Sequence, residues 1–227
     1  MSNIKGEVMI PAEQDYSLRE KKFVKTKVSL MQAFMSRLKT TRFANISIKE
    51  VCESVEVSEG TFYNYFPQKV DVVYYYKSLV SVKIAWEINR KKSELSPWQL
   101  IQYVFELISV ELQPPYLFYE MISIFTGEQR RPEALALSPL EKEYAYPDCP
   151  GIGDVGIGLL EDLFAALIKE AQNSHEIDPA LDVEQVMFAL MSIAIGIALT
   201  IKIEDFADIN GRYQAQLSFL YKAIGAK

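Results

Sequence analysis

The stretch VSEGTFYNYFPQK, residues 57–69, decides the fold. Ser58 is a residue type that caps helix N-termini, and Pro67 ends a helix because it lacks a backbone N–H. These two residues predict a short helix from Ser58 to about Tyr65. The stretch is rich in aromatic side chains and holds no Lys or Arg before Lys69. We therefore expect its hydroxyl groups and its helix N-terminus, rather than cations, to make its contacts.

A second short helix precedes this one and completes a helix-turn-helix. Ser47-Ile-Lys-Glu50 has the spacing of a capping box, in which each side chain bonds the other residue's backbone N–H. Helical periodicity then separates two sets of side chains. The set expected to face inward is Ile46, Val51, Val55, Val57, Phe62 and Phe66. The set expected to face outward is Lys49, Ser58, Glu59, Thr61, Tyr63 and Tyr65.

A longer helix, predicted from about Leu18 to Lys39, begins with a second such pair, Ser17 and Glu20. Residues 1–70 hold 11 Lys and Arg against 8 Asp and Glu, whereas the remainder holds 13 against 22. A basic head on an acidic body is expected if only the head meets a polyanion, although a solvated helix face is the simpler alternative. The densest basic cluster is Arg19, Lys21, Lys22, Lys25 and Lys27.

The rest of the chain also predicts helices, so the fold class is all-α. Proline and serine signals at Ser96-Pro97 and Pro114-Pro115 start two of them. The predicted helices cover about residues 68–92, 97–113, 115–126, 155–173, 183–203 and 210–224. Residues 127–154 are rich in proline and predict a long loop. We divide the chain into a helix-turn-helix domain, residues 1–67, and a helical body, residues 68–227.

At this point a family resemblance is evident. Residues 30–72 resemble the DNA-binding head of the TetR (tetracycline-repressor-like) family of bacterial regulators. The family pattern Val-Ser-x-Gly-Thr-aromatic-Tyr-x-x-Phe-x-x-Lys is matched without gaps by residues 57–69, and Phe43 matches an aromatic position after the first helix. Two usual turn glycines are replaced by Arg42 and Glu56. Non-glycine residues rarely adopt positive φ, so the two turns are expected to be re-formed.

The resemblance implies roles for the outward side chains. Lys49 and Glu59 fall at positions that face bases, where a glutamate accepts from cytosine N4 or repels phosphate. Ser47, Thr61, Tyr63, Tyr65 and Lys69 fall at positions that bind phosphates. From the residues themselves, helix N-termini attract phosphate and a glycine permits close approach of the backbone. The predicted DNA-binding set is completed by Ser58, Gly60, Lys21 and Lys25.

Candidates for other chemistry carry little weight. Gly151–Gly158 contains a Gly-x-Gly-x-x-Gly pattern, but no buried strand precedes it, so we interpret it as a hinge. His175 is the single histidine and cannot supply a metal site alone. Cys52 and Cys149 form no Cys-x-x-Cys pair, which indicates neither zinc nor a disulfide framework. We predict no catalytic residue, no metal and no cofactor, and hence no enzyme.

The body is expected to bind a small effector and a second copy. Its aromatic and methionine side chains are individually typical of a core, yet the resemblance implies that they could line an apolar pocket. The predicted pocket set is Trp86, Tyr103, Phe118, Met121, Phe125, Phe164 and Met187. The segment 183–203 is apolar on nearly all sides, and with 210–224 it predicts a homodimer through a four-helix bundle. Burial inside one chain is the alternative.

The longest uncharged apolar stretch, Val186 to Ile201, has sixteen residues and is shorter than the roughly 20 apolar residues of a membrane span, so we expect a buried helix. The N-terminus lacks the apolar run of a signal peptide. We therefore expect a cytoplasmic protein. The first hypothesis is a ligand-responsive repressor that binds a palindromic operator as a homodimer and is released by an apolar or aromatic effector. The alternatives are a helical small-molecule-binding protein or enzyme without a DNA role, and a DNA-binding regulator controlled by a protein partner.

Overall fold

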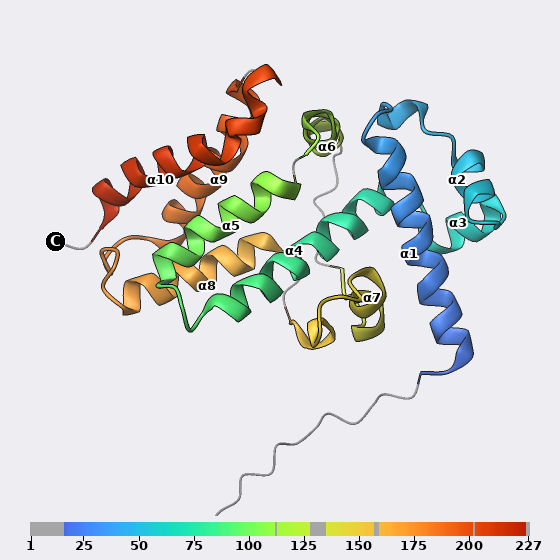
Figure 1. The fold of residues 1–227 in the computed structure, drawn as a ribbon, viewed down its shortest axis with the longest axis horizontal. Helices are drawn as coiled ribbons and strands as arrows, with labels where there is room; N and C mark the ends of the chain where they lie inside the picture. Colours follow the sequence, from blue (N-terminus) through green and yellow to red (C-terminus); the bar gives the residue numbers. More distant parts are fainter. Residues whose placement is uncertain (1–15, 112, 128–134, 157–158, 202, 226–227) are drawn as a thin grey trace, which may run out of the picture.

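The computed structural model describes residues 16–111, 113–127, 135–156, 159–201 and 203–225. These residues form ten α-helices and three short 3-10 helices, with no strand longer than one isolated bridge. Figure 1 shows an elongated molecule in which α2 and α3 lie at one end and α9 and α10 at the other. Helix α4 runs between the two ends. The predicted all-α fold class is confirmed.

The head is built from four elements, of which the three α-helices begin at their predicted caps. They are α1 (Leu18–Leu38), η1 (Phe43–Asn45), α2 (Ile48–Ser54) and α3 (Glu59–Tyr65). Ser17 and Glu20 form the predicted capping box of α1. The side chains of Ser47 and Ser58 accept hydrogen bonds from backbone N–H groups of α2 and α3. The local signals therefore place the head helices to within a residue or two.

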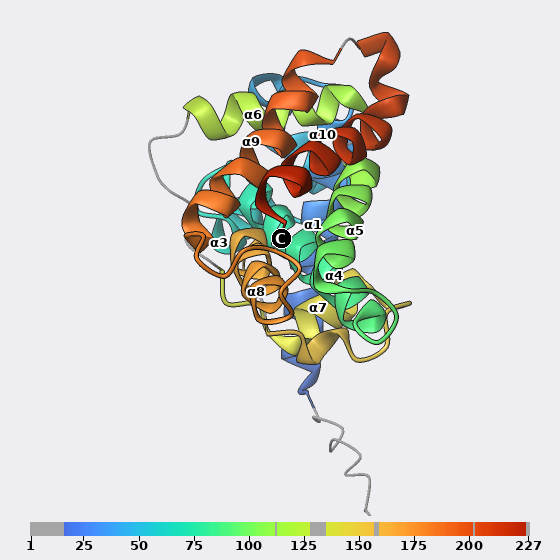
Figure 2. The ribbon, with the colours of Figure 1, turned by 90° about the vertical axis from the view of Figure 1, so that its left-hand side faces the viewer.

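The body contains six longer helices. They are α4 (Asp71–Lys91), α5 (Pro97–Glu111), α6 (Pro115–Gly127), α8 (Leu160–Asn173), α9 (Val183–Thr200) and α10 (Ile209–Ile224). A 3-10 helix, η3 (Ile203–Asp208), separates α9 from α10. Figure 2 shows α10 lying along α5 and α9. The Tyr213 hydroxyl on α10 donates to the carbonyl of Ala194 on α9 at 2.8 Å, which fixes this packing.

The predicted loop 127–154 is wrong in part. It contains α7 (Pro139–Ala145) and a 3-10 turn, η2 (Ile152–Asp154). Ser138 and Glu141 form a full capping box at the start of α7, with proline at the first helical turn. The same Ser-x-x-Glu signal that locates α1 and α2 therefore marks α7 as well. The next helix, predicted from residue 155, begins at Leu160.

Two apolar clusters hold the molecule together. The head cluster joins the buried residues of α1, α2 and α3 and of α4 up to Leu79, with Leu117, Ile124 and Leu140 from α6 and α7. The body cluster begins at Val82 on α4 and continues to Leu217. The two clusters thus meet within α4. The division of the chain at residues 67 and 68 stays a proposal.

Helix α9 is the least buried of the long apolar helices. By length and composition alone it could cross a membrane, with a mean hydropathy of 1.8 over Val183–Thr200, and 17% of that window is buried within the chain. Its exposed apolar side chains include Phe188, Ile195 and Leu199. The alternative of burial inside one chain is therefore wrong, because α8 and α10 cover only part of the circumference of α9. The homodimer stays a prediction.

Candidate nucleic-acid interface

Four buried side chains anchor the helix-turn-helix to the rest of the head. Ile46, Val51, Phe62 and Phe66 are buried, with exposed fractions of 4% or less. Val55 and Val57 are only half-buried and pack at the edge of the head cluster. The rings of Phe62 and Phe66 lie 5.6 Å apart, and Phe66 continues the contact to another ring on α4. The buried aromatic row fixes α3 against α1 and α4.

The turn between α2 and α3 keeps its left-handed geometry without a glycine. Glu56 has φ 58°. Its N–H bonds the carbonyl of Glu53, and the N–H of Val57 bonds the carbonyl of Cys52, which is the Schellman pattern of a helix end. Arg42, by contrast, has φ −56° and needs no glycine. The expectation of two re-formed turns is therefore wrong at Glu56, where the usual conformation persists at the expense of local strain.

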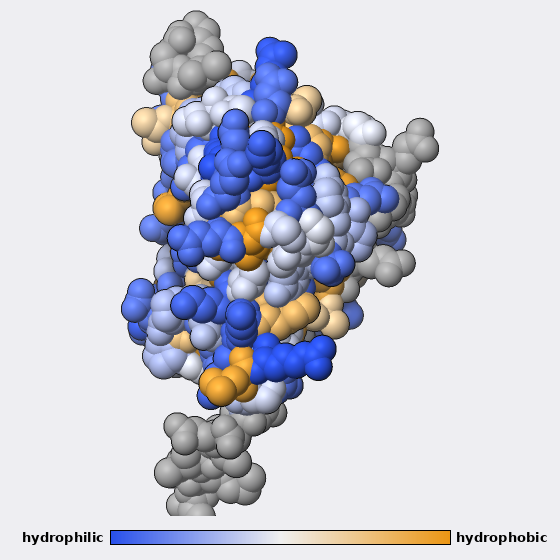
Figure 3. Space-filling model, turned by 90° about the vertical axis from the view of Figure 1, so that its right-hand side faces the viewer, coloured by the Kyte–Doolittle hydropathy of each residue, from blue (hydrophilic) through white to orange (hydrophobic). Residues whose placement is uncertain are grey.

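The outward side chains lie where the sequence predicts. Lys49, Ser58, Glu59 and Gly60 are exposed, and Tyr63 is 47% exposed. Ser47, Thr61 and Tyr65 are half-buried. Figure 3 shows the side of the molecule at the α2 and α3 end as a largely hydrophilic surface with scattered apolar spots. Apart from Tyr65, which packs against the edge of the head cluster, this set forms one face outside that cluster.

Glycine at position 60 is not required by the packing of the chain itself. A Cβ added there would meet only the Ser58 hydroxyl oxygen, at an ordinary 3.7 Å. The hydroxyl oxygens of Ser58 and Thr61 lie 2.9 Å apart, and the Thr61 N–H donates to Ser58 at 3.2 Å. The first turn of α3 is thus an exposed backbone edge bordered by two hydroxyls. Such an edge is suited to close approach by phosphate.

The basic cluster on α1 is smaller than the sequence predicts. Arg19, Lys21, Lys22 and Lys25 are exposed. Lys27 is not part of this surface, because its ammonium donates to the Glu141 carboxylate at 2.8 Å and 21% of its side chain is exposed. Besides the basic cluster, α1 supplies an aromatic contact: the ring of Phe23 lies 4.6 Å from that of Tyr65 on α3. Four cations of α1 therefore remain available to a polyanion.

The predicted phosphate contact of Lys69 needs correction. Its ammonium donates to the backbone carbonyls of Phe43, Ala44 and Ile46, with a distance of 2.8 Å to Ile46. It also lies 4.8 Å from the centre of the Phe43 ring, and burial lowers the pKa of Lys69. An ammonium has three N–H donors, so these carbonyls occupy it. Lys69 anchors the chain between α1 and α2 against the start of α4.

The seven residues of the predicted pocket divide between the two apolar clusters. Trp86, Phe118 and Phe164 are buried in the body cluster, with Tyr103 and Met187 at its edge. Met121 and Phe125 instead pack against the head cluster. The Trp86 indole N–H donates to the Pro150 carbonyl at 3.0 Å, so this side chain is committed to the core. Helical spacing does not say which of two clusters a side chain joins, and the effector pocket stays a prediction for these residues.

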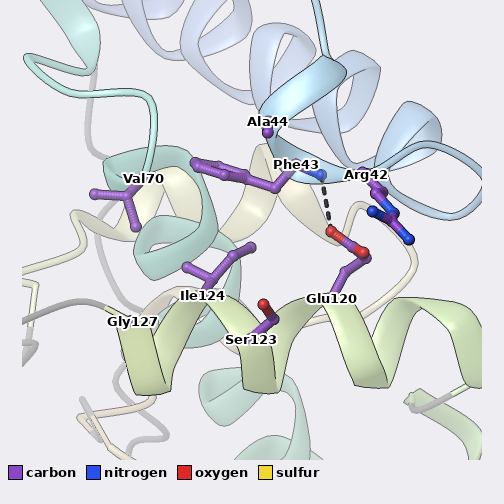
Figure 4. A pocket seen from close by; sticks show the side chains of 8 residues that line it. All are labelled: Arg42, Phe43, Ala44, Val70, Glu120, Ser123, Ile124 and Gly127. Carbon is purple, nitrogen blue, oxygen red and sulfur yellow. Dashed lines mark hydrogen bonds between the residues drawn. The ribbon is translucent and has the colours of Figure 1, made fainter.

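A cleft that the sequence did not predict lies between the head and α6. It has a volume of about 540 Å³ and is lined by Arg42, Phe43, Ala44, Val70, Glu120, Ser123, Ile124 and Gly127. Figure 4 shows the Glu120 carboxylate accepting from the backbone N–H of Phe43, at 2.8 Å. This bond crosses the cleft and connects η1 to α6. Nothing in the local sequence of Glu120 signals it, since the two residues are 77 positions apart.

The remaining chemical candidates have ordinary structural places. Within the described part of the chain, no group of three or more His, Cys, Asp or Glu side chains could hold a metal ion. His175 follows the end of α8 with φ 60°, and its Nδ1 lies 3.2 Å from the Asn173 carbonyl. Cys52 is buried and Cys149 is half-buried. The glycine-rich stretch contains η2, and its residues 157–158 lie outside the described residues.

The arrangement defines a class of protein: an all-helical chain with a helix-turn-helix at one end. No protein-family model matches the sequence, and no curated protein matches it. Among solved structures it resembles FadR of Thermus thermophilus, a TetR-family transcriptional repressor in complex with lauroyl-CoA. That match has a TM-score of 0.61 and 18% identity over 88% of this chain and 96% of the other.

Two further solved structures agree. A TetR-family regulator from Shewanella sp. PV-4 matches with a TM-score of 0.57 and 13% identity, over 89% of this chain and 99% of the other. The ketosteroid transcriptional regulator KstR2 of Mycobacterium tuberculosis matches with a TM-score of 0.52 and 12% identity, over 88% and 95%. The chain has the fold of TetR-family transcriptional regulators over most of its length.

Proposed function

We propose that this protein is a TetR-family transcriptional regulator that represses transcription by binding a palindromic operator as a cytoplasmic homodimer. The observation that carries the proposal is the outward face of α2 and α3, which is exposed and backed by a fully buried aromatic row. Neither the exposed hydroxyls nor Gly60 is needed to complete the head cluster. A rigid helical element is suited to the major groove of DNA when its polar outer face takes no part in the packing of the protein itself.

The charges of the head support the proposal that different helices contact the phosphates and the bases of DNA. Helix α3 contains no Lys or Arg, so phosphate attraction comes from the exposed cations of α1 and from Lys49. Lys49 is held only loosely by Glu53, at 3.9 Å with both side chains mostly exposed. Glu59 stands at the first position of α3. There we propose that it accepts from cytosine N4, because a carboxylate can accept hydrogen bonds but cannot donate them.

The exposed apolar face of α9 and α10 supports the homodimer. Phe188, Ile195 and Leu199 are 65%, 39% and 49% exposed and recur along one side of α9. Phe219 on α10 is 65% exposed. Exposed apolar surface of this kind is costly in water and is typical of an interface. A second copy that covers it would form a four-helix bundle, in which the two recognition helices meet half-sites about 34–36 Å apart.

We propose that a small apolar or aromatic effector controls the protein from within its helical body. FadR was solved with lauroyl-CoA, and KstR2 is a ketosteroid regulator. The effector would act only if it binds the DNA-incompetent arrangement more tightly than the competent one. The split of the predicted pocket residues between two clusters favours a second candidate, a DNA-binding regulator controlled by a protein partner.

The test is a binding titration with the purified protein and palindromic sequences from its own promoter. We expect the affinity to fall steeply with salt. Lys21→Ala and Lys25→Ala should each weaken binding to all sequences and lower the slope of log affinity against log salt by about 1. Lys169→Ala, an exposed lysine of α8 in the body, is the matched control and should change neither quantity. A flat salt response, or turnover of a small molecule without DNA affinity, would contradict the regulator.

A further inference from the structure

Helix α7 carries two neighbouring buried charges that face opposite ways. Glu141 and Lys142 are 6% and 8% exposed. One oxygen of Glu141 accepts from the ammonium of Lys27 on α1, at 2.8 Å. The ammonium of Lys142 instead donates to the carbonyls of Gly153 and Val155, at 3.0 and 2.7 Å. The first contact reaches the head, and the second reaches a segment that belongs to the body.

On the head side, the ion pair touches three elements at once. The Lys27 ammonium lies 4.3 Å from the centre of the Tyr75 ring on α4 and 6.0 Å from that of Phe66. Phe66 is the residue that ends α3. Figure 1 shows α7 lying beside the N-terminal half of α1, in agreement with the contacts between the two helices. The position of Glu141 therefore bears on α1, on the end of the recognition helix and on α4.

On the body side, α7 is fixed to the segment around η2. Ile152 and Val155 are members of the body cluster. The Trp86 indole ties the same segment to α4 through the carbonyl of Pro150. A Cβ at Gly153 would lie 3.2 Å from the Cβ of Pro139, so η2 packs tightly against the start of α7. Helix α7 thus cannot shift without moving η2.

A buried ion pair needs a reason other than stability, because an apolar pair of the same volume is often equally stable. Here the second oxygen of Glu141 accepts from the backbone N–H and hydroxyl of Ser138, at 2.8 and 2.9 Å. Both oxygens of the carboxylate are therefore bonded, and it is held in one orientation. An apolar pair could not fix one orientation in this way, because hydrogen bonds are directional and apolar contacts are not.

We propose that α7 is a strut and that Lys27 and Glu141 are positioning residues, which hold the DNA-binding head at one angle to the body. In the homodimer this angle sets the distance between the two recognition helices. The strut therefore decides which spacing between operator half-sites the protein accepts. The inference rests on the proposed function, since it concerns how the same interface is presented to DNA.

The experiment compares operators whose half-sites are separated by the native spacer and by one or two base pairs more or fewer, together with a single half-site. The test variants are Glu141→Gln and the double variant Lys27→Met/Glu141→Leu, which replaces the ion pair by apolar side chains and keeps the fold. The matched control is Glu170→Gln, because its pair with Lys92 has the same 2.8 Å distance but lies wholly within the body.

We expect the wild type and Glu170→Gln to share a sharp spacing optimum. Both test variants should lose discrimination between spacers while keeping the wild-type affinity for a single half-site. An unchanged spacing profile in the double variant would overturn the strut. An equal loss of affinity on every DNA, the single half-site included, would also overturn it, because the pair would then act on the head alone.

A second readout needs no DNA and separates the strut from the proposed function. Spin labels at cysteines introduced for Asn64 on α3 and Lys169 on α8, both exposed, report the head-to-body distance. The background is Cys149→Ser, since Cys52 is buried. Labelled protein is diluted with unlabelled protein to isolate distances within one chain. We expect a narrow distance distribution in the wild type and a broad one in the double variant. Equal widths would overturn the strut even if DNA binding is confirmed, and a wild type that binds no DNA refutes only the regulator.

Discussion

The head and the far end of the body differ in how far their large apolar side chains are buried. In the head, the large inward side chains of α1 to α3 are buried, and the outer face is mostly polar, with Leu18 and Phe23 exposed on α1. In α9 and α10, phenylalanines at 188 and 219 are each 65% exposed. A surface whose apolar side chains are buried within one chain, and whose outer face is polar, is suited to a charged and hydrated partner such as DNA. A surface left apolar is suited to a partner that excludes water, and a second copy is the partner we propose.

The largest expected effect on stability comes from comparing a buried side chain of the head with an exposed one. Phe62 is fully buried and Tyr63, its neighbour on α3, is 47% exposed. Phe62→Ala should destabilise the fold by about 3–5 kcal/mol, because it removes a buried ring and leaves a cavity. Tyr63→Ala should leave stability within about 0.5 kcal/mol and weaken operator binding. Thermal unfolding and DNA titration of both variants measure the contrast, and equal destabilisation would contradict it.

The next effect concerns the junction of head and body and depends on pH. Burial alone would raise the pKa of Glu141, but hydrogen bonds from Lys27 and Ser138 outweigh it and hold the pKa below its ordinary 4.5. A lowered folded-state pKa adds stability that is present above pH 4.5 and is lost as pH falls through the folded-state value. Glu141→Gln should destabilise by about 1–3 kcal/mol at neutral pH, because it leaves a partly buried ammonium without its counter-charge.

Urea titrations between pH 2 and pH 7 should show the difference between Glu141→Gln and wild type shrinking on the acid side. Glu170→Gln is the control, since its partly exposed pair is worth roughly 0–1 kcal/mol. A difference between Glu141→Gln and wild type that stays constant down to pH 2 would show that the carboxylate charge is not what matters.

The body's exposed apolar face gives the third test. Phe188→Glu and Phe219→Glu should weaken self-association, because each fully buried phenylalanine contributes about 1.5–3 kcal/mol. Sedimentation equilibrium measures the change, and Gln216→Glu, an exposed polar position on the same helix as Phe219, adds charge without removing an apolar side chain. If both phenylalanine variants assemble like the wild type, the dimer lies elsewhere.

The smallest expected effect compares the two positions where glycine is usual. Glu56 has positive φ, so Glu56→Gly should stabilise the protein by about 1 kcal/mol through relief of strain. Arg42 has φ −56°, so Arg42→Gly should destabilise by about 0.5–1 kcal/mol through added unfolded-state entropy. Opposite signs in paired thermal melts confirm the assignment. The same sign for both would mean that local contacts outweigh backbone conformation at one of them.

Local sequence signals predicted the helices of the head well because each depends on residues three or four positions apart. Ser47, Ser58 and their N-terminal turns satisfy their own hydrogen bonds and need no distant partner. Helix α7, which was not predicted, follows the same rule, because the capping box of Ser138 and Glu141 is recognisable in the sequence. Helical periodicity predicted the outward face, and the structure leaves Lys49, Glu59 and Tyr63 exposed, with Thr61 and Tyr65 half-buried. The DNA roles that the resemblance to TetR proteins implies stay a prediction.

The sequence by itself determined that the chain is helical, where its capped helices begin and which face of the helix-turn-helix is polar. Only the tertiary structure decided which cations are free. Lys27 finds its carboxylate 114 positions away, and Lys69 finds its carbonyls 23 to 26 positions away. The physical reason is range: caps and periodicity are satisfied within one helical turn, whereas burial of a charge depends on segments that only the folded chain brings together.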